Sequence, residues 1–359
     1  MKYYIKSNSR FCFSNITTIL RSFCPAKFNK SHLDCLNAIV RGLIEERSVC
    51  LEKLAMSLPS SAQSGEQRIR RFLNLNVFKP QELCIRLLKS ISPPDQPLTV
   101  LIDRTQWKLG FNPVRIDYNI LQASVLVGHE ALPVMAKVLD NKGGLVSASV
   151  LVEFLESLYQ CFGNRRIIII ADREFPYLMP LRWLRIMQIP FIVRVKGNSN
   201  FIDTMHGGKE FTVMDVADKI GIGDSIELQQ VMFRGRVAVN LNITKFVNRH
   251  QNEEILSVIS SEVEKNQLEY YRYRWSIEHS FRFFKSSGMH VNHTHILSMQ
   301  RFFNLWMIIM ITVNLCWQIG RILDSIWPIK RKSHGRRQIS TFRYGLNIIA
   351  ASVKFGCNF

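Results

Sequence analysis

Hydrophobic spacing separates a helical first part of the chain from a strand-rich middle part. Between residues 1 and 95, apolar residues recur at the spacing of a helix, most clearly from His32 to Arg47 and over Glu66–Leu75. A turn-rich stretch at 59–65 precedes the second of these helices, and a proline-rich stretch at 92–97 ends the helical pattern. We therefore expect a helical N-terminal domain over residues 1–95.

From residue 96 onwards the apolar residues form short, β-branched runs. Buried strands are expected at Leu98–Ile102, Tyr118–Val127, Leu132–Leu139, Arg166–Ala171 and Pro190–Val195. Helical spacing predicts helices at Val150–Cys161 and Phe175–Met187. Three strands, a helix, a strand, a helix and a strand form an α/β order, which predicts a mixed sheet with flanking helices over residues 96–195.

Three further segments follow the predicted sheet. Residues 196–261 are again rich in strand-like runs and would form a β-rich insertion, whose strands are expected at Ile226–Phe233, Val237–Phe246 and Glu254–Ile259. Helical spacing returns over 262–326, and a basic C-terminal tail follows at 327–359. The apolar run Leu305–Ile319 is shorter than the ~20 residues that a membrane-spanning helix needs, so a helix buried in a globular domain is predicted.

The charge balance points to a polyanionic partner. The chain has 47 Lys and Arg against 28 Asp and Glu, a net charge of +19. An excess of this size favours binding to nucleic acid. An anionic membrane surface or a ribosome remains an alternative partner on charge alone.

The cysteines and the N-terminus indicate the compartment. The 8 cysteines are scattered, without a C-x-x-C pair or zinc-ligand spacing, which is typical of a reducing environment. The first 20 residues lack the unbroken apolar stretch of a signal peptide. We expect a cytoplasmic, nucleoid-associated protein.

Two aspartates end the two most hydrophobic strand-like runs of the predicted sheet. Asp103 follows Leu98–Ile102, and Asp172 follows Arg166–Ala171. A carboxylate at the exit of a buried strand is held rigidly yet reaches solvent, as a metal ligand must. A single Asp in this setting is more commonly a helix cap or turn residue, but two of them favour a site. Glu174 is the alternative to Asp172, which we prefer because it lies nearer the strand end.

The segment from Tyr271 to Lys285 predicts a helix with one apolar and one polar face. At ~100° per residue, the polar face carries Tyr271, Arg274, Glu278, Arg282 and Lys285. The opposite face carries Tyr273, Ile277, Phe281 and Phe284. An ordinary amphipathic helix with i,i+4 ion pairs explains the apolar face. Three cations around one carboxylate exceed what such pairs need, and suit a site that meets phosphates and holds a metal.

A second basic helix is expected in the N-terminal domain. On Glu66–Leu75, Arg68 and Arg71 lie about 60° apart, while Ile69 and Phe72 would pack inward. Helix, turn and basic helix is compatible with a module that reads a DNA groove. A small helical cap with a solvated basic face explains the same pattern.

These motifs together resemble a known group of enzymes. Tyr271-x2-Arg274-x3-Glu278-x6-Lys285 matches in full the signature of a large group of bacterial insertion-sequence transposases of the DDE type. Asp103 in Ile-Asp-Arg-Thr and Asp172 in Ala-Asp-Arg-Glu look like the other two acidic motifs of that group. The tail from Lys332 to Leu346 also resembles the group, so the similarity covers about residues 95–350.

The resemblance implies a ribonuclease-H-like catalytic domain, formed by residues 96–195 and 262–326 around the insertion at 196–261. Asp103, Asp172 and Glu278 would bind two Mg²⁺ or Mn²⁺ ions, which activate water or a DNA 3′-OH. Tyr271, Arg274 and Lys285 would contact phosphates at the transposon end. Arg282, Arg68 and Arg71 are expected to add DNA contacts.

The resemblance also implies partners. Double-stranded DNA, as transposon ends and target, would be bound by a homodimer on paired ends, and the element would move by cutting and pasting. Members of the group often form a DNA hairpin while an aromatic residue of the insertion holds out a base; Phe233 is the candidate here. Asp203 stands where a P-loop needs glycine, so ATP is not implied. The alternatives are an inactive transposase-derived DNA-binding protein and a nuclease without strand transfer.

Overall fold

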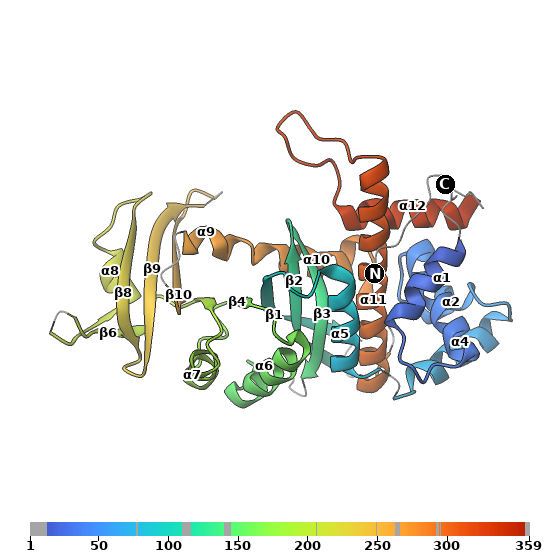
Figure 1. Ribbon diagram of the computed structural model, residues 1–359, viewed down its shortest axis with the longest axis horizontal. Helices are drawn as coiled ribbons and strands as arrows, with labels where there is room; N and C mark the ends of the chain where they lie inside the picture. The colour runs from blue at the N-terminus through green and yellow to red at the C-terminus, as the bar shows by residue number, and fades with distance from the viewer. Residues whose placement is uncertain are drawn as a thin grey trace.

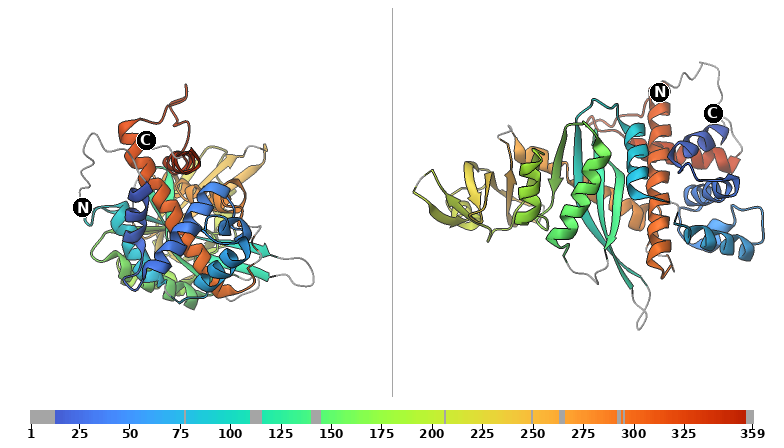
Figure 2. Two further views of the ribbon diagram at one scale, coloured as in Figure 1. Left: turned by 90° about the vertical axis from the view of Figure 1, so that its right-hand side faces the viewer. Right: turned by 60° about the horizontal axis from the view of Figure 1, so that its bottom comes forward.

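A single mixed sheet runs through the centre of the molecule, with helices around it (Figures 1 and 2). The computed structural model of the 359-residue chain describes residues 13–76, 78–109, 116–139, 145–205, 207–248, 250–262, 266–291, 294 and 296–355. Within these residues the sheet has ten strands in the order β3-β2-β1-β4-β5-β10-β9-β8-β6-β7.

The first five strands form the predicted α/β core. They are β1 (Leu98–Leu109), β2 (Ile116–Val127), β3 (Glu130–Leu139), β4 (Ile167–Ala171) and β5 (Phe191–Arg194). β1, β2 and β3 are antiparallel neighbours, whereas β4 pairs in parallel with both β1 and β5. α6 (Ala148–Phe162) and α7 (Leu178–Ile186) connect the parallel strands. Parallel strands need such crossovers, which explains why the helices alternate with strands here.

The insertion extends this sheet rather than forming a separate one. Its strands are β6 (Asn200–Asp203), β7 (Lys209–Thr212), β8 (Ser225–Phe233), β9 (Val237–Val247) and β10 (Glu253–Ser260), with the short helix α8 (Val213–Ala217). β10 pairs antiparallel with β5, so the insertion continues the hydrogen-bonded ladder of the core. Hydrophobic patterning predicted the three longer strands but not β6 and β7, which are short and partly exposed.

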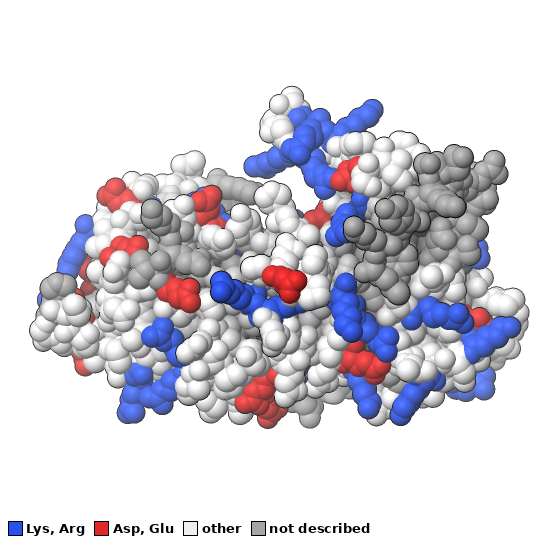
Figure 3. Space-filling view, viewed as in Figure 1, with Lys and Arg blue, Asp and Glu red and all other residues white. Residues whose placement is uncertain are grey.

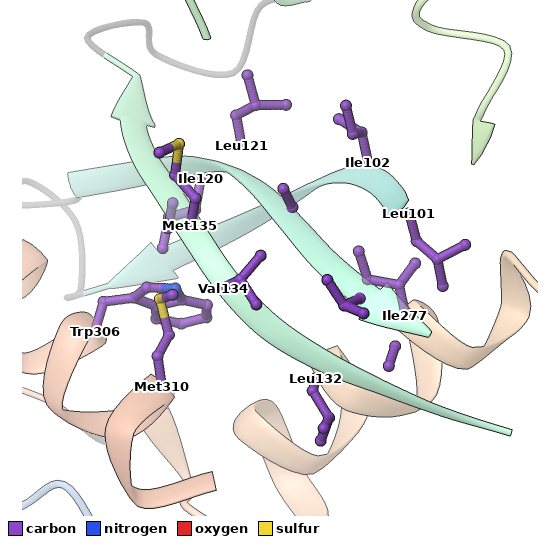
Figure 4. Close-up of a cluster of buried hydrophobic side chains, with 14 of the residues drawn as sticks. Leu101, Ile102, Ile120, Leu121, Leu132, Val134, Met135, Ile277, Trp306 and Met310 are labelled. Carbon is purple, nitrogen blue, oxygen red and sulfur yellow. The ribbon is translucent and has the colours of Figure 1, made fainter. Parts of the chain in front are cut away.

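Helices from the N-terminal and the C-terminal half of the sequence cover β1, β2 and β3. α5 (Pro80–Ile91), α10 (Trp275–Arg282) and α11 (Met299–Ile326) all pack against β3. In Figure 4, Trp306 and Met310 of α11 lie against the apolar side chains of these strands, together with Ile277 of α10. Their burial, with Trp306 and Ile277 fully inaccessible, supplies the main apolar driving force for the core.

α11 is the only described helix that is long and apolar enough to cross a membrane by length and composition, yet 89% of its most apolar window is buried inside the protein. It is therefore the central core helix that the sequence predicted. The buried Asn314 side chain donates to the Pro133 carbonyl at 2.8 Å. This bond ties α11 to β3.

The N-terminal residues form helices that pack on α11. They are α1 (Phe13–Phe23), α2 (Lys30–Glu46), α4 (Ala62–Leu73) and α5, while α3 (Leu51–Ala55) packs on α2 and α4. The stretch predicted as a turn up to Gly65 instead includes the first turn of α4. Ser61 caps that helix, accepting a bond from the Ser64 N–H at 3.3 Å. Gly65 belongs inside it because a Cβ there would lie 3.0 Å from the Ala55 Cβ of α3.

The stretch predicted as a basic tail contains a helix, α12 (Thr341–Phe355), that packs along α11. The two helices cross at glycines. A Cβ on Gly345 would lie 1.9 Å from the Cys316 carbonyl oxygen, and one on Gly320 would lie 2.0 Å from the Thr341 carbonyl oxygen. Only glycine permits backbones this close, so these two residues decide where α12 sits.

Candidate active site

Strand register places the two aspartates side by side. β1 pairs in parallel with β4, with Ile102 opposite Ala171, so Asp103 and Asp172 are the next residues along each strand. Asp172 follows the last residue of β4, as predicted. Asp103 does not end its strand, because β1 continues to Leu109 through its pairing with β2. The apolar run of β1 ends before Asp103 because β4, its parallel neighbour, pairs with β1 only as far as Ile102.

The predicted single helix from Tyr271 to Lys285 is divided into shorter pieces. α9 (Gln267–Arg272) is followed by a tight turn, then by α10 and a π-helical segment over Phe283–Ser287. In the turn, the Arg274 N–H donates to the Tyr271 carbonyl at 3.0 Å, which is an i to i+3 bond. Such bonds tighten the chain and alter the helical angle between residues on either side.

A single guanidinium group gathers the three predicted acids. Arg274 Nη1 lies 2.9 Å from Asp103 Oδ2, and Nη2 is hydrogen-bonded to Glu278 Oε1. Arg274 Nε lies 3.9 Å from Asp172 Oδ1. The Arg274 side chain is 5% exposed, whereas that of Glu278 is 47% exposed, so the cluster opens to solvent on the Glu278 side.

Tyr271 orients one of these acids. Its hydroxyl donates to Asp172 Oδ1 at 2.9 Å, and its ring centroid lies 5.7 Å from the Arg274 guanidinium carbon. The residue is only 2% exposed. The sequence predicted that Tyr271 and Arg274 contact DNA phosphates, but in this structure both point into the acid cluster.

Burial dominates the electrostatics of the cluster. It raises the pKa of Asp103 to about 7, although Arg274 and the Arg104 N–H oppose that rise. The pKa of Arg274 is also raised, because Tyr271 and the three carboxylates outweigh the effect of burial. Burial raises the pKa of Tyr271 well above its usual range. The guanidinium therefore stays charged and the Tyr271 hydroxyl stays protonated at neutral pH.

Residues 94–315 match the family described as "Transposase DDE domain". That match covers more than half of the chain. The chain belongs to this family.

A solved structure shows a similar fold. The piggyBac transposase, in a synaptic complex with hairpin DNA, superposes with a TM-score of 0.51 at 13% identity, covering 90% of this chain and 71% of that one. This likeness supports a ribonuclease-H-like arrangement of the mixed sheet and its helices. The Drosophila P element transposase strand transfer complex reaches a TM-score of only 0.28 at 12% identity, covering 92% and 80% of the two chains. No curated protein matches the chain.

Two other acids of the α/β core, Glu174 and Glu130, have structural partners. Glu174 forms a two-pronged ion pair with Arg104, at 2.8 and 3.0 Å. Arg104 follows Asp103 in β1, and successive strand residues point to opposite faces, so this pair lies away from Asp103. Glu130 accepts bonds from the first N–H groups of α12. These contacts favour Asp172 over Glu174 as the cluster acid.

Lys285 and Arg282 are the remaining cations predicted for the polar face of the segment from Tyr271 to Lys285. The Lys285 amine is 5.7 Å from the Trp107 ring centroid, and burial lowers the pKa of this half-buried lysine. Lys285 belongs to the π-helical segment, whose residues turn through a smaller angle than those of an α-helix. Arg282 is exposed at the end of α10.

The predicted N-terminal arginines lie on α4, far along the chain from the acids. Arg71 is exposed and donates to the Gln67 carbonyl at 3.3 Å; Arg68 is half-buried and donates to the Ser31 carbonyl at 3.4 Å. Ile69 and Phe72 are buried, as the helical pattern predicted. α4 therefore has an apolar inner face and a basic outer one.

The prediction that Phe233 of the insertion holds out a DNA base is wrong. Phe233 is fully buried, with its ring centroid 5.4 Å from that of Phe201, so it cannot hold a base. A cleft of about 600 Å³ nearby is lined by three cations that the sequence analysis did not single out, Arg173, Lys196 and Arg234, and by the acids Glu174 and Glu210. The one available signal was Arg173, which directly follows Asp172.

The acid cluster has the right ligand atoms for a divalent cation, but its side chains are not arranged to bind one in this structure. Carboxylate oxygens are the ligands that Mg²⁺ prefers. Across the ranges that the structure describes, no three His, Cys, Asp or Glu side chains are close enough to share a metal ion. Arg274 explains this, because its guanidinium lies between the carboxylates. The donor set fits a metal once that group moves.

Proposed function

We propose that this protein is a transposase that binds the ends of an insertion sequence and catalyses metal-dependent DNA cleavage and strand transfer. The observation that carries the proposal is the convergence of Asp103, Asp172 and Glu278 on one cationic group. These acids come from two strands and a helix, so only the folded chain brings them together. A catalytic centre is the simplest reason to concentrate acids in a protein of net charge +19.

In this proposal the three acids hold two Mg²⁺ or Mn²⁺ ions. When bound, the ions would supply activation of water or of a DNA 3′-OH and stabilisation of the leaving oxygen. The chain's own residues position the ligands. The Tyr271 hydroxyl holds Asp172, and the Arg104 N–H donates to Asp103 Oδ1 at 2.7 Å. Both bonds fix carboxylate orientation before any ion arrives.

Arg274 acts in this proposal as an internal counter-ion that gives way to metal. A guanidinium among the acids would repel an incoming divalent ion, so the side chain must leave. The exposed Glu278 side is the open route. Outside the cluster, its planar donors would suit a DNA phosphate. The buried position in this structure and the phosphate contact expected from the family would then be two states of one residue.

The proposed partner is double-stranded DNA, at transposon ends and at the target, bound by a homodimer on paired ends. The net charge of +19 supports a polyanionic partner. The setting would be the bacterial nucleoid, in the cytoplasm. Cut-and-paste movement is part of the same proposal.

The test is an assay of paired end DNA with Mg²⁺ that scores both cleavage and joining. Asp103→Asn, Asp172→Asn and Glu278→Gln should each reduce both by about 10³-fold or more while binding to DNA persists, because only the chemical step needs the ions. Glu174→Gln is the matched control, since its partner is Arg104. Cleavage without joining would indicate a nuclease, and binding without cleavage an inactive descendant.

Sequence recognition is proposed to reside in α4. In the full chain, Arg68→Ala with Arg71→Ala should reduce the preference for end DNA over scrambled DNA by about tenfold, because base contacts specify and phosphate contacts do not. Arg70→Ala is the control, because Arg70 pairs with Glu66. An unchanged preference would show that α4 is a structural helix with a basic face and does not read DNA sequence.

A further inference from the structure

A group of basic residues lies between α11 and α12 in the sequence, outside the acid cluster. Residues 330–338 form a hairpin loop, closed by a single antiparallel bridge, that projects from the body (Figure 1). Arg331 and Arg337 form its antiparallel bridge. The Lys332 N–H donates to the Arg336 carbonyl at 2.8 Å, and the Gln338 N–H donates to the Lys330 carbonyl at 2.8 Å. We call this element the basic hairpin.

The basic hairpin carries five cations and no acid, namely Lys330, Arg331, Lys332, Arg336 and Arg337. All of them are exposed, and Figure 3 shows Lys and Arg side chains gathered on the projection. Side chains alternate between the two faces of a β-ribbon. Lys330, Lys332 and Arg336 therefore share one face.

The two faces differ in their partners. On the first, Arg337 donates to Asp324 Oδ2 and to Thr341 Oγ1, and Arg331 donates to the Gly335 carbonyl at 3.2 Å. On the second, Lys330, Lys332 and Arg336 form no side-chain ion pair with any residue that the structure describes. Three like charges kept together without a counter-ion are destabilising in the free protein, which points to a polyanionic partner.

The base of the basic hairpin is fixed on both sides. Asp324, in the last turn of α11, also accepts a bond from the Ile329 N–H at 2.8 Å. Glu130 of β3 accepts from the Thr341 N–H at 2.5 Å and the Phe342 N–H at 3.3 Å, which anchors the start of α12. An element held in this way loses little conformational freedom when it binds.

We propose that the basic hairpin grips the phosphate backbone of duplex DNA through Lys330, Lys332 and Arg336, away from the acid cluster. The choice of DNA as the polyanion rests on the proposed function. A two-stranded ribbon has the dimensions to enter the major groove, where phosphates of both strands flank it. The proposed contacts are with phosphates, which position DNA without reading its sequence.

The test measures affinity for duplex DNA against salt concentration, without divalent ions, in the full chain. Lys330→Ala, Lys332→Ala and Arg336→Ala combined should lower the salt slope by about two to three, since each phosphate contact contributes ~0.9. A charge-preserving triple, Lys330→Arg, Lys332→Arg and Arg336→Lys, should keep the slope. A control triple, Lys209→Ala, Lys219→Ala and Arg236→Ala, removes equal charge from exposed positions of the insertion.

The outcomes separate this proposal from the catalytic one. An unchanged slope in the first triple, or an equal loss in the control triple, overturns the basic hairpin as a DNA grip. If the slope falls only in the first triple, and the wild-type protein binds DNA but never cleaves it, the grip is sustained and the catalytic proposal is removed. Binding to vesicles of anionic lipid, lost in the first triple while DNA binding is unaffected, would replace DNA by a membrane surface.

Discussion

Arg274 and Arg336 carry the same charge in opposite surroundings. Arg274 is 5% exposed and surrounded by three carboxylates, whereas Arg336 is exposed on a hairpin that contains no acid. The first is neutralised by the protein itself, and the second has no counter-ion among the described residues. The interactions of a buried cation such as Arg274 depend on the ionisation of its acids, and those of an exposed cation such as Arg336 depend on salt concentration. A motif match or a count of charges cannot distinguish them.

The largest effect is expected from removing the buried cation. Arg274→Met leaves three carboxylates together without a counter-ion, so the metal-free protein should lose about 3–5 kcal/mol of unfolding free energy. Mg²⁺ or Mn²⁺ should restore more stability to this variant than to the wild type, because the ions take over the neutralising role. Denaturant unfolding with and without metal checks both points. Arg274→Lys keeps the charge and should lose less unfolding free energy than Arg274→Met. If metal stabilised the wild type and both variants equally, the counter-ion role would be contradicted.

Asp103 should make stability depend on pH in the metal-free protein. Its pKa is raised to about 7 by burial, so the folded state holds a proton that the unfolded state releases near pH 4. Stability therefore falls as the pH rises from about 4 to 7 and is level above. Between about pH 4 and 7, the unfolding free energy of Asp103→Asn should therefore rise by about 2–4 kcal/mol relative to that of the wild type. Urea unfolding at several pH values measures the gain, and a constant difference between the two proteins would show that Asp103 ionises normally.

The anchor of the basic hairpin can be loosened without touching a charge. Gly345→Ala places a Cβ against the Cys316 carbonyl of α11, so the helices must separate at a cost of about 1–3 kcal/mol. Gly197→Ala is the control, since its new Cβ meets only the flexible Met214 side chain. Thermal unfolding compares the two variants. If Gly345→Ala were as stable as the control, α12 would not pack as described.

The smallest effect is expected at the salt bridge that fixes the basic hairpin. Arg337→Ala removes an exposed pair with Asp324, which should cost at most ~1 kcal/mol of stability. DNA affinity should fall about two- to threefold, because a looser hairpin loses more conformational freedom on binding. Fluorescence anisotropy at fixed salt measures the change. A loss as large as that of the Lys330, Lys332 and Arg336 triple would place Arg337 itself on DNA.

The sequence by itself determined the local elements and the identity of the acid cluster. Periodicity predicted β4 and the strands of the core, because burial on both faces leaves continuous apolar runs. It also predicted a buried helix at Leu305–Ile319, although α11 itself extends over Met299–Ile326 and is long enough to cross a bilayer. Fixed spacing between Tyr271, Arg274 and Glu278 identified the acid of the helix, since those residues lie within a few turns of one another.

Tertiary structure decided everything that depends on contacts between distant segments. Asp103 lies inside β1 because β2 continues the ladder, which no local pattern records. Whether Arg274 faces DNA or the acids depends on β1 and β4, residues far from it in sequence. The crossing of α11 and α12 at Gly320 and Gly345 turned an expected tail into the anchored base of the basic hairpin. Short-range patterns report which surface a residue can bury, and only the folded chain determines what it is buried against.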